Sequence, residues 1–174
     1  MDTDTNQLID DERPTYRSPY TVDLFGLTEL DQIKAYMDAV RALPRSLYFL
    51  MNDQATPRYL HENVAVKFGL LETQAIELTR IVRDVLLSII YIGELAPNIQ
   101  TRLGIQESSA RDIANTLATE LFGPVIADVK ALQLAYFGDR IASQQVPQTQ
   151  SNRQPPPRPP LATPPPPPPR DDNL

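Results

Sequence analysis

Few side chains in this sequence could perform chemistry, and none of them has the spacing of a catalytic or metal site. His61 is the only histidine, and the chain contains no cysteine. Zinc sites need three or four ligands of these types, so the sequence predicts no metal site. No cofactor is expected either, because no cofactor motif is present. We interpret His61 as an ordinary, partly exposed side chain.

Carboxylates are the remaining candidates for catalysis. Asp112, Glu120 and Asp128 recur along one predicted helix, and paired acids can serve as general acid and base. A solvated helix face explains their positions better. The sequence also has no G-x-x-x-x-G-K-[ST] phosphate loop, no G-x-G-x-x-G and no G-x-S-x-G elbow. It therefore predicts a non-enzymatic protein without catalytic residues, and an uncharacterised enzyme is the third alternative.

A proline-rich segment near the C-terminus is the stronger functional clue. Residues 153 to 170 read R-Q-P-P-P-R-P-P-L-A-T-P-P-P-P-P-P-R. Such a segment favours an extended polyproline II arm of about 45 Å over residues 155 to 169. Its start fits the R-x-x-P-x-x-P form that aromatic grooves bind, so the candidate partner-binding residues are Arg153, Pro156, Arg158, Pro159 and Arg170. A solvating spacer without a partner is the alternative.

Nucleic-acid binding is the second alternative, because residues 103 to 110, L-G-I-Q-E-S-S-A, are similar to a helix-hairpin-helix motif. That motif uses a second glycine to expose backbone N–H groups to phosphate, and Gln106 replaces it here. Glu107 would also face the phosphate. Residues 28 to 142 contain fourteen acids and eleven bases, whereas affinity for nucleic acid depends on Lys and Arg. We therefore consider nucleic acid an unfavoured partner.

The elements that carry these residues include a repeated phrase. Residues 63 to 75 and 98 to 110 align with a constant offset, and four positions are identical: Asn63/Asn98, Gly69/Gly104, Glu72/Glu107 and Ala75/Ala110. Periods of 20 to 50 residues are typical of repeated supersecondary units. Each copy predicts a helix, a glycine and a second helix.

Glycine is the structural centre of each copy. Helices often end with a glycine in the left-handed conformation, which costs other residues more, and we assign this role to Gly69 and Gly104. Lys67 and Arg102 would then lie in a last helical turn, where cations suit the helix dipole. Acidic residues suit the first turn of the helix that follows.

Apolar periodicity predicts the remaining helices. A capping box of Thr28 and Asp31 is expected to open the first of them. A break is expected at Gly123-Pro124, because proline lacks the N–H group and clashes with the preceding turn. The predicted helices cover residues 28 to 42, about 47 to 51, 57 to 68, 72 to 92, 97 to 103 and 107 to about 137.

Composition separates this helical part from two arms. The chain has 174 residues and 18 prolines, and 12 of these prolines fall between Pro147 and Pro169. We predict an acidic disordered arm over residues 1 to 27, an all-α bundle of about six helices over 28 to 142, and a disordered proline-rich tail over 143 to 174. Residues 23 to 27 are the exception, since their apolar side chains could dock on the bundle.

Location and membrane insertion can be addressed from the same composition. The longest apolar stretch, Val85 to Ile92, has eight residues including Ser88, and a membrane-spanning helix needs about 18. The start, Met-Asp-Thr-Asp, lacks the basic region of a signal peptide. The sequence therefore predicts a cytoplasmic protein without a membrane span.

Several short phrases together carry a resemblance. They are A-L-P at 42 to 44, K-F-G-L at 67 to 70, D-V-L-L at 84 to 87, R-L-G-I at 102 to 105 and E-L-F-G-P at 120 to 124. From about residue 30 to 137 the chain resembles small helical proteins of unknown function from bacteria of the candidate phyla radiation. The resemblance implies a bundle of about six helices and a bacterial source, and no activity. The chain departs from these proteins at Leu71 and Gln106, which are poor N-caps.

These observations favour a protein-protein interaction or scaffold module. Its partner is expected to be a protein that the sequence does not identify. Its oligomeric state and biological process stay open.

Overall fold

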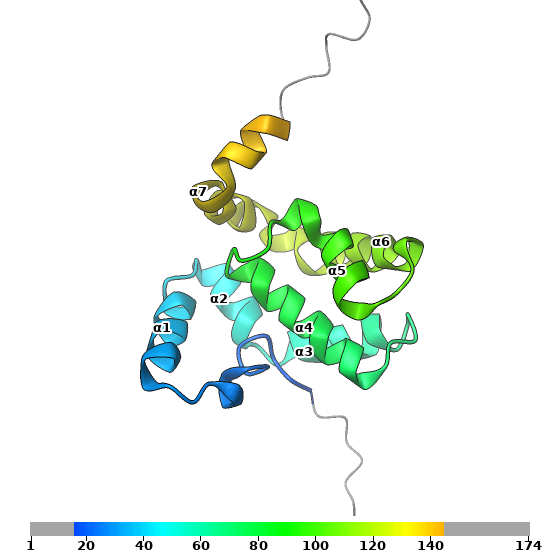
Figure 1. Cartoon of the computed structure of the whole chain (residues 1–174), viewed down its shortest axis with the longest axis horizontal. Helices are drawn as coiled ribbons and strands as arrows, with labels where there is room; N and C mark the ends of the chain where they lie inside the picture. Colours follow the sequence, from blue (N-terminus) through cyan, green and yellow to red (C-terminus); the bar gives the residue numbers. More distant parts are fainter. Residues whose placement is uncertain (1–15, 145–174) are drawn as a thin grey trace, which may run out of the picture.

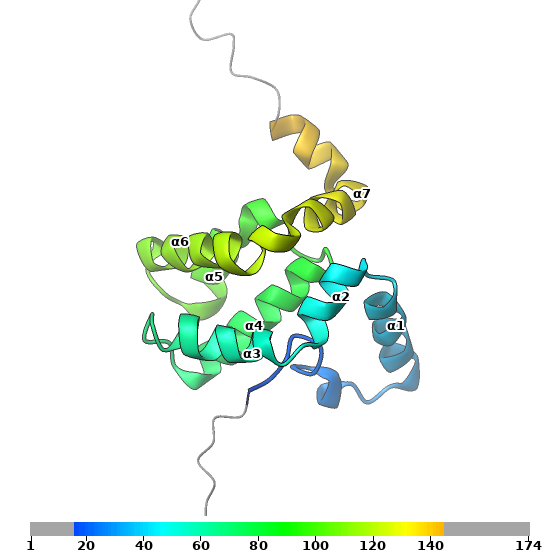
Figure 2. The same cartoon turned by 180° about the vertical axis from the view of Figure 1, so that it is seen from behind.

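The computed structural model describes residues 16 to 144 and confirms an all-α bundle (Figures 1 and 2). The proline-rich tail and its candidate residues lie outside this part of the chain. The described helices are α1 (Leu30–Arg41), α2 (Arg45–Asn52), α3 (Ala55–Tyr59), α4 (Glu72–Leu86), α5 (Leu95–Leu103), α6 (Glu107–Thr116) and α7 (Ile126–Gln144). Short 3-10 turns η1 (Leu24–Gly26), η3 (Ile92–Glu94) and η5 (Gly123–Val125), and π-helical segments η2 (Leu60–Ala65) and η4 (Leu117–Leu121), connect them.

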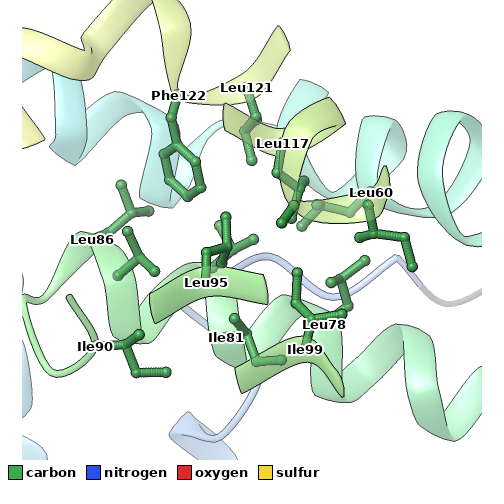
Figure 3. Close-up of a cluster of buried hydrophobic side chains, with 14 of the residues drawn as sticks. Leu60, Leu78, Ile81, Leu86, Ile90, Leu95, Ile99, Leu117, Leu121 and Phe122 are labelled. Atoms are coloured by element: carbon green, nitrogen blue, oxygen red, sulfur yellow. The ribbon is translucent and has the colours of Figure 1, made fainter. Parts of the chain in front are cut away.

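Helix α4 lies at the centre of the bundle, with α1 and α2 to one side of it and α5 and α6 to the other (Figures 1 and 2). Leu78, Ile81 and Leu86 on α4 are fully buried. They meet Ile99 from α5 and Phe122 from the segment after η4 (Figure 3). Burial of such apolar surface is the main force that holds the helices together.

The two predicted helix-glycine-helix units are confirmed. Gly69 and Gly104 have φ angles of 63° and 64°. The N–H of Gly69 donates to the Val66 carbonyl and that of Leu70 donates to the Ala65 carbonyl, which is the Schellman arrangement. Gly104 donates to the Gln100 carbonyl at 3.0 Å, the simpler left-handed cap.

Helix α4 ends at Leu86, so the predicted helix over 72 to 92 is wrong in its last turns. Ser88 has a φ of 55°. Its N–H donates to the Val85 carbonyl, and the N–H of Ile89 donates to the Asp84 carbonyl at 2.7 Å. This is again a Schellman cap, with serine in the place that glycine usually takes. This cap was not predicted, because serine rarely adopts the left-handed conformation.

A buried glutamine holds the turn that follows α4. Gln133 of α7 is completely buried. Its Nε2 donates to the carbonyls of Val85 and Ile90, and its Oε1 accepts from the N–H of Ile92. Backbone groups that leave the helix are thereby satisfied, as buried polar groups must be.

The break at Gly123-Pro124 is confirmed, with Pro124 near the start of η5. Before it, Leu117 and Leu121 of η4 are both buried, as residues four apart on one helical face are expected to be. After the break, Val129 of α7 is buried, whereas Tyr136 of the same helix is 68% exposed.

Residues 16 to 22, which were predicted to belong to a disordered arm, contact the bundle instead, whereas docking was already expected for residues 23 to 27. Val22 is 4% exposed, and residues 24 to 26 form η1. The predicted capping box is also absent, since α1 starts after Glu29 without a side-chain cap. Leu71 and Gln106 precede α4 and α6 as expected, likewise without a bond from their side chains.

Replacing Gly69 or Gly104 by Ala should destabilise the protein by about 1 kcal/mol each, because the left-handed conformation disfavours a Cβ. A Cβ at either position would meet no atom within 4 Å, so the cost comes from the backbone alone. Urea unfolding measures it. The control is Gly26→Ala, which has equally open space and no positive φ; equal losses at Gly26 and Gly104 would contradict the assignment.

Replacing Ser88 by Gly should stabilise the protein by about 1 kcal/mol, since glycine relieves the left-handed strain. The substitution also removes a buried hydroxyl that has no hydrogen-bond partner among the described residues. Thermal unfolding of Ser88→Gly and Ser88→Ala separates the two causes. Removal of the buried hydroxyl should stabilise both variants. Relief of the left-handed backbone strain should stabilise Ser88→Gly only.

Candidate interaction surfaces

The N-terminal segment contacts α1, α2 and α4 through residues 20 to 23, and the surface that these helices offer to it is called the groove below. The N–H of Tyr20 donates to the carbonyl of Met51 at 3.2 Å. The hydroxyl of Tyr36 donates to the carbonyl of Tyr20 at 2.7 Å, and the two tyrosine rings stack with centroids 5.8 Å apart. Burial raises the pKa of Tyr36 to about 12, so its hydroxyl keeps the proton it donates. Backbone and ring contacts therefore fix this segment at two points.

Asp23 supplies the third point. Its Oδ1 accepts from Nε of Arg80 at 2.8 Å, and its Oδ2 accepts from a terminal nitrogen of Arg83. Both arginines belong to α4. The carboxylate of the N-terminal segment thus bridges two guanidinium groups of the central helix.

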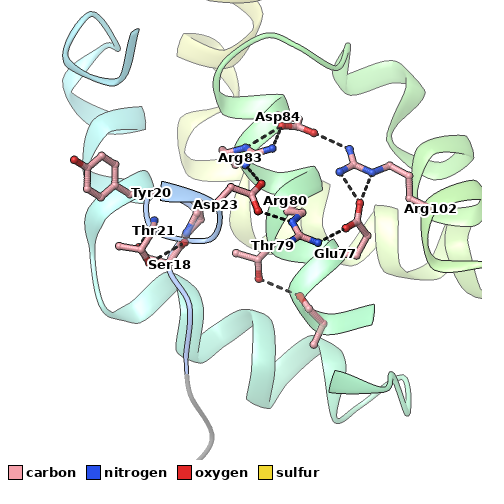
Figure 4. A network of polar contacts seen from close by, with 12 residues as sticks. Ser18, Tyr20, Thr21, Asp23, Glu77, Thr79, Arg80, Arg83, Asp84 and Arg102 are labelled. Carbon is pink, nitrogen blue, oxygen red and sulfur yellow. Dashed lines mark hydrogen bonds and ion pairs between the residues drawn. The ribbon is translucent and has the colours of Figure 1, made fainter. Parts of the chain in front are cut away.

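Six charged side chains form a closed ring around this contact (Figure 4). Arg80 pairs with Glu77 at 2.9 Å, and Arg102 of α5 pairs with Glu77 and Asp84 at 2.6 Å each. Arg83 returns to Asp84 at 2.8 Å. Acids and bases alternate around the ring, so each charge has two partners of opposite sign. Asp84 is 8% exposed in its side chain, and a charge this buried needs such pairing.

The ring lowers the pKa values of its more exposed acids. Partial burial would raise the pKa of Asp23, but hydrogen bonds from Arg80 and Arg83 outweigh it, and the pKa lies below the usual value. Burial likewise opposes the lowered pKa of Glu77, where Arg80 and Arg102 prevail. Both acids are therefore ionised at neutral pH and hold the arginines in place.

Sequence spacing explains part of the ring. Glu77 and Arg80 are three residues apart on α4 and meet as neighbours on a helix surface do. Arg80 and Asp84 are four residues apart and could pair by the same rule, but Asp84 bonds to Arg83 and Arg102 instead. Sequence reasoning missed Asp23 altogether, and the only signal was an acidic residue beside apolar ones in a segment predicted to dock.

A cavity of about 470 Å³ lies beside the same segment. Its lining residues are Tyr16, Ser18, Thr21, Asn52, Asp53, Gln54, Pro57 and Arg58. Much of its polar lining is already bonded: Asp53 accepts from the Thr56 N–H, and Arg58 bonds to Glu62 at 3.2 Å. Tyr16 also donates to Glu62, which raises the pKa of Tyr16. Residues of the N-terminal segment thus form part of the cavity wall.

Helix α7 presents the second surface. Val129 and Gln133 face the core, whereas Leu134 and Tyr136 on the same helix are 58% and 68% exposed. Ile89, in the turn that Gln133 holds, is exposed as well. Large apolar side chains that stay exposed are found at contact sites for other proteins.

The histidine and the carboxylates that were considered for catalysis make contacts with neighbouring side chains. His61 lies against the ring of Tyr16, with centroids 5.2 Å apart, and its Nδ1 is buried without a hydrogen-bond partner among the described residues. Glu120 accepts from Tyr59 at 2.9 Å, and Asp128 accepts from Ser46. Burial and the bond to Glu120 raise the pKa of Tyr59. Glu120 and Asp128 thus bond to residues of other segments. Asp112 and Glu120 are exposed, as a solvated helix face predicts, whereas Asp128 is half-buried.

The hairpin between α5 and α6 was the candidate for nucleic acid. Arg102, its nearest cation before the turn, is held by Glu77 and Asp84. Glu107 lies in the first turn of α6 and pairs with Arg111. The place where phosphate would bind therefore carries a carboxylate. Within residues 16 to 144, no three His, Asp or Glu side chains are grouped for a metal ion, and no helix is long and apolar enough to cross a membrane.

Replacing Asp23 by Asn should destabilise the protein at pH 7 by about 1 kcal/mol, because two charge-assisted hydrogen bonds weaken in a partly exposed site. The folded pKa of Asp23 is lowered, so its stabilising effect is present above the unfolded value near 3.8 and is lost as pH falls through the folded value. Urea unfolding should show a smaller difference in stability between wild type and Asp23→Asn at pH 3 than at pH 7. Asp38→Asn, which removes an exposed acid 3.7 Å from Arg41, is the control; an equal loss there would contradict the role of Asp23.

Comparison with known proteins leaves the family open. No protein-family model matches the chain, and no curated protein or solved structure is significantly similar to it. The resemblance to proteins of the candidate phyla radiation and the cytoplasmic location therefore stay predictions.

Proposed function

We propose that this protein is a non-enzymatic interaction module whose main contact surface is the exposed side of α7. The observation that carries the proposal is the exposure of Leu134 and Tyr136 on a helix that also contributes to the core. Apolar residues occur around most of the circumference of α7, and a helix of this kind is normally covered on several sides. A partner would supply the missing cover.

The position of α7 suits this role. It extends away from the rest of the bundle in both views (Figures 1 and 2). Phe137 has φ and ψ of −125° and 20°, which bends the helix. The ring of Phe137 lies 5.7 Å from that of Tyr91, so the bend stays attached to the body. A partner could therefore reach α7 from the side without disturbing the core.

The proline-rich tail follows α7 directly in the sequence. We propose that it assists binding as a polyproline arm in which Arg153, Arg158 and Arg170 set the orientation against an acidic groove. Pro156 and Pro159 would contact the aromatic lining of that groove. This part of the proposal is supported by the sequence alone, with a spacer as its alternative.

We expect a photoreactive phenylalanine at Tyr136 to crosslink a specific protein in cells, because Tyr136 is 68% exposed on the helix that we propose as the contact surface. Val66 is the matched control, since it is 66% exposed and belongs to the turn between α3 and α4. Mass spectrometry identifies the products. Equal crosslinking of the same protein from positions 136 and 66 would contradict the proposal. Crosslinking of nucleic acid from position 136, and not from position 66, would also contradict it.

Two further variants separate the helix from the tail. Leu134→Glu should reduce capture at least about tenfold, because burying a charge at an interface is costly. Arg153→Ala with Arg158→Ala should weaken it about as much as deleting residues 145 to 174, if the arginines orient the tail. Capture that is unchanged by this deletion would leave the tail as a spacer.

A further inference from the structure

We infer that the groove holding residues 20 to 23 is a docking site for a short acidic peptide of a partner protein, and that the chain's own segment occupies it as an internal competitor. The inference concerns a surface separate from α7 and does not depend on the proposed function.

The segment is held as a bound peptide would be. One backbone N–H, that of Tyr20, donates to Met51, and one side chain, Val22, is buried. One carboxylate, that of Asp23, contacts Arg80 and Arg83. Main-chain bonds, an apolar pocket and a charged anchor are the elements of peptide recognition.

The groove keeps its charge when the segment leaves. Arg80 stays paired with Glu77, and Arg83 stays paired with Asp84, so neither guanidinium loses its support. Without Asp23, the ring contains three arginines and two carboxylates, which leaves one uncompensated positive charge. An arginine pair that is fixed in this way favours a carboxylate that accepts two hydrogen bonds.

The segment can leave at low cost to the bundle. It is joined to α1 through residues 26 to 29, of which Gly26, Thr28 and Glu29 are exposed and Leu27 is half-buried. A Cβ on Gly26 would meet nothing within 4 Å, so no other element packs against this glycine. Displacement exposes the sites of the buried Pro19 and Val22, the site of Tyr20 and the two arginines.

The chemistry of the groove defines the partner peptide. It needs an aliphatic side chain of valine size immediately before an aspartate. An aromatic residue two positions before the aliphatic one would stack on Tyr36 as Tyr20 does. Charge complementarity excludes a basic peptide, because the uncompensated charge in the empty groove is positive.

The test uses the full chain and a labelled peptide with the sequence of residues 16 to 27. Val22→Ser with Asp23→Asn weakens the internal segment, and we expect this variant to bind the peptide. Wild type should bind it at least about tenfold more weakly, since occupied grooves reduce apparent affinity. A peptide carrying Asn in place of the aspartate should bind the variant at least about tenfold more weakly than the native peptide.

Folding is checked by helical circular dichroism and cooperative melting, and Asp23→Asn alone serves if the double variant is not folded. Adding Arg83→Gln to the variant should abolish binding of the native peptide. A folded variant that does not bind the peptide, or that binds the asparagine peptide equally well, would overturn the inference. Wild-type dimers that disappear in Asp23→Asn would identify a second copy as the occupant and overturn the assignment to a separate partner.

Discussion

The closed ring of three arginines and three carboxylates is the constraint on which the arrangement of this bundle depends. Its members come from the N-terminal segment, α4 and α5, which are far apart in sequence. Taking partly buried charges out of water is costly unless each is paired. The pairs between α4 and α5 meet this condition without Asp23, and Asp23 adds the contacts that fix the N-terminal segment on α4. The ring therefore favours one placement of α5 and of the segment on α4 among those that apolar packing alone would allow.

The ends of the helices obey a related rule. Three helix ends find partners for their backbone groups: in glycine caps at residues 69 and 104, and in the serine cap at residue 88 with the side chain of Gln133 beside it. These devices let short helices turn inside a small core. Helix α7 differs in its side chains: Leu134 and Tyr136 are not covered by other residues of the described chain.

Local features could be predicted from the sequence. Gly69, Gly104 and Pro124 act through their own backbones, and their effects are the same in any context. The cap at Ser88 and the bonds of Asp23 depend on contacts with distant elements, which no local pattern encodes. Gln133 left a signal, a polar residue on an apolar helix face. The tail residues that were predicted to bind a partner lie beyond the described chain.

The two π-helical segments also bear on how the chain tolerates changes in length. In η2 and η4, the N–H groups of Val66 and Phe122 donate to carbonyls five residues earlier. Such a turn contains one more residue than an α-helical turn. Deleting one residue within either segment would return it to a regular α-helix while the flanking residues keep their order. Homologues with single-residue gaps are therefore expected at these two positions, where the core can absorb them.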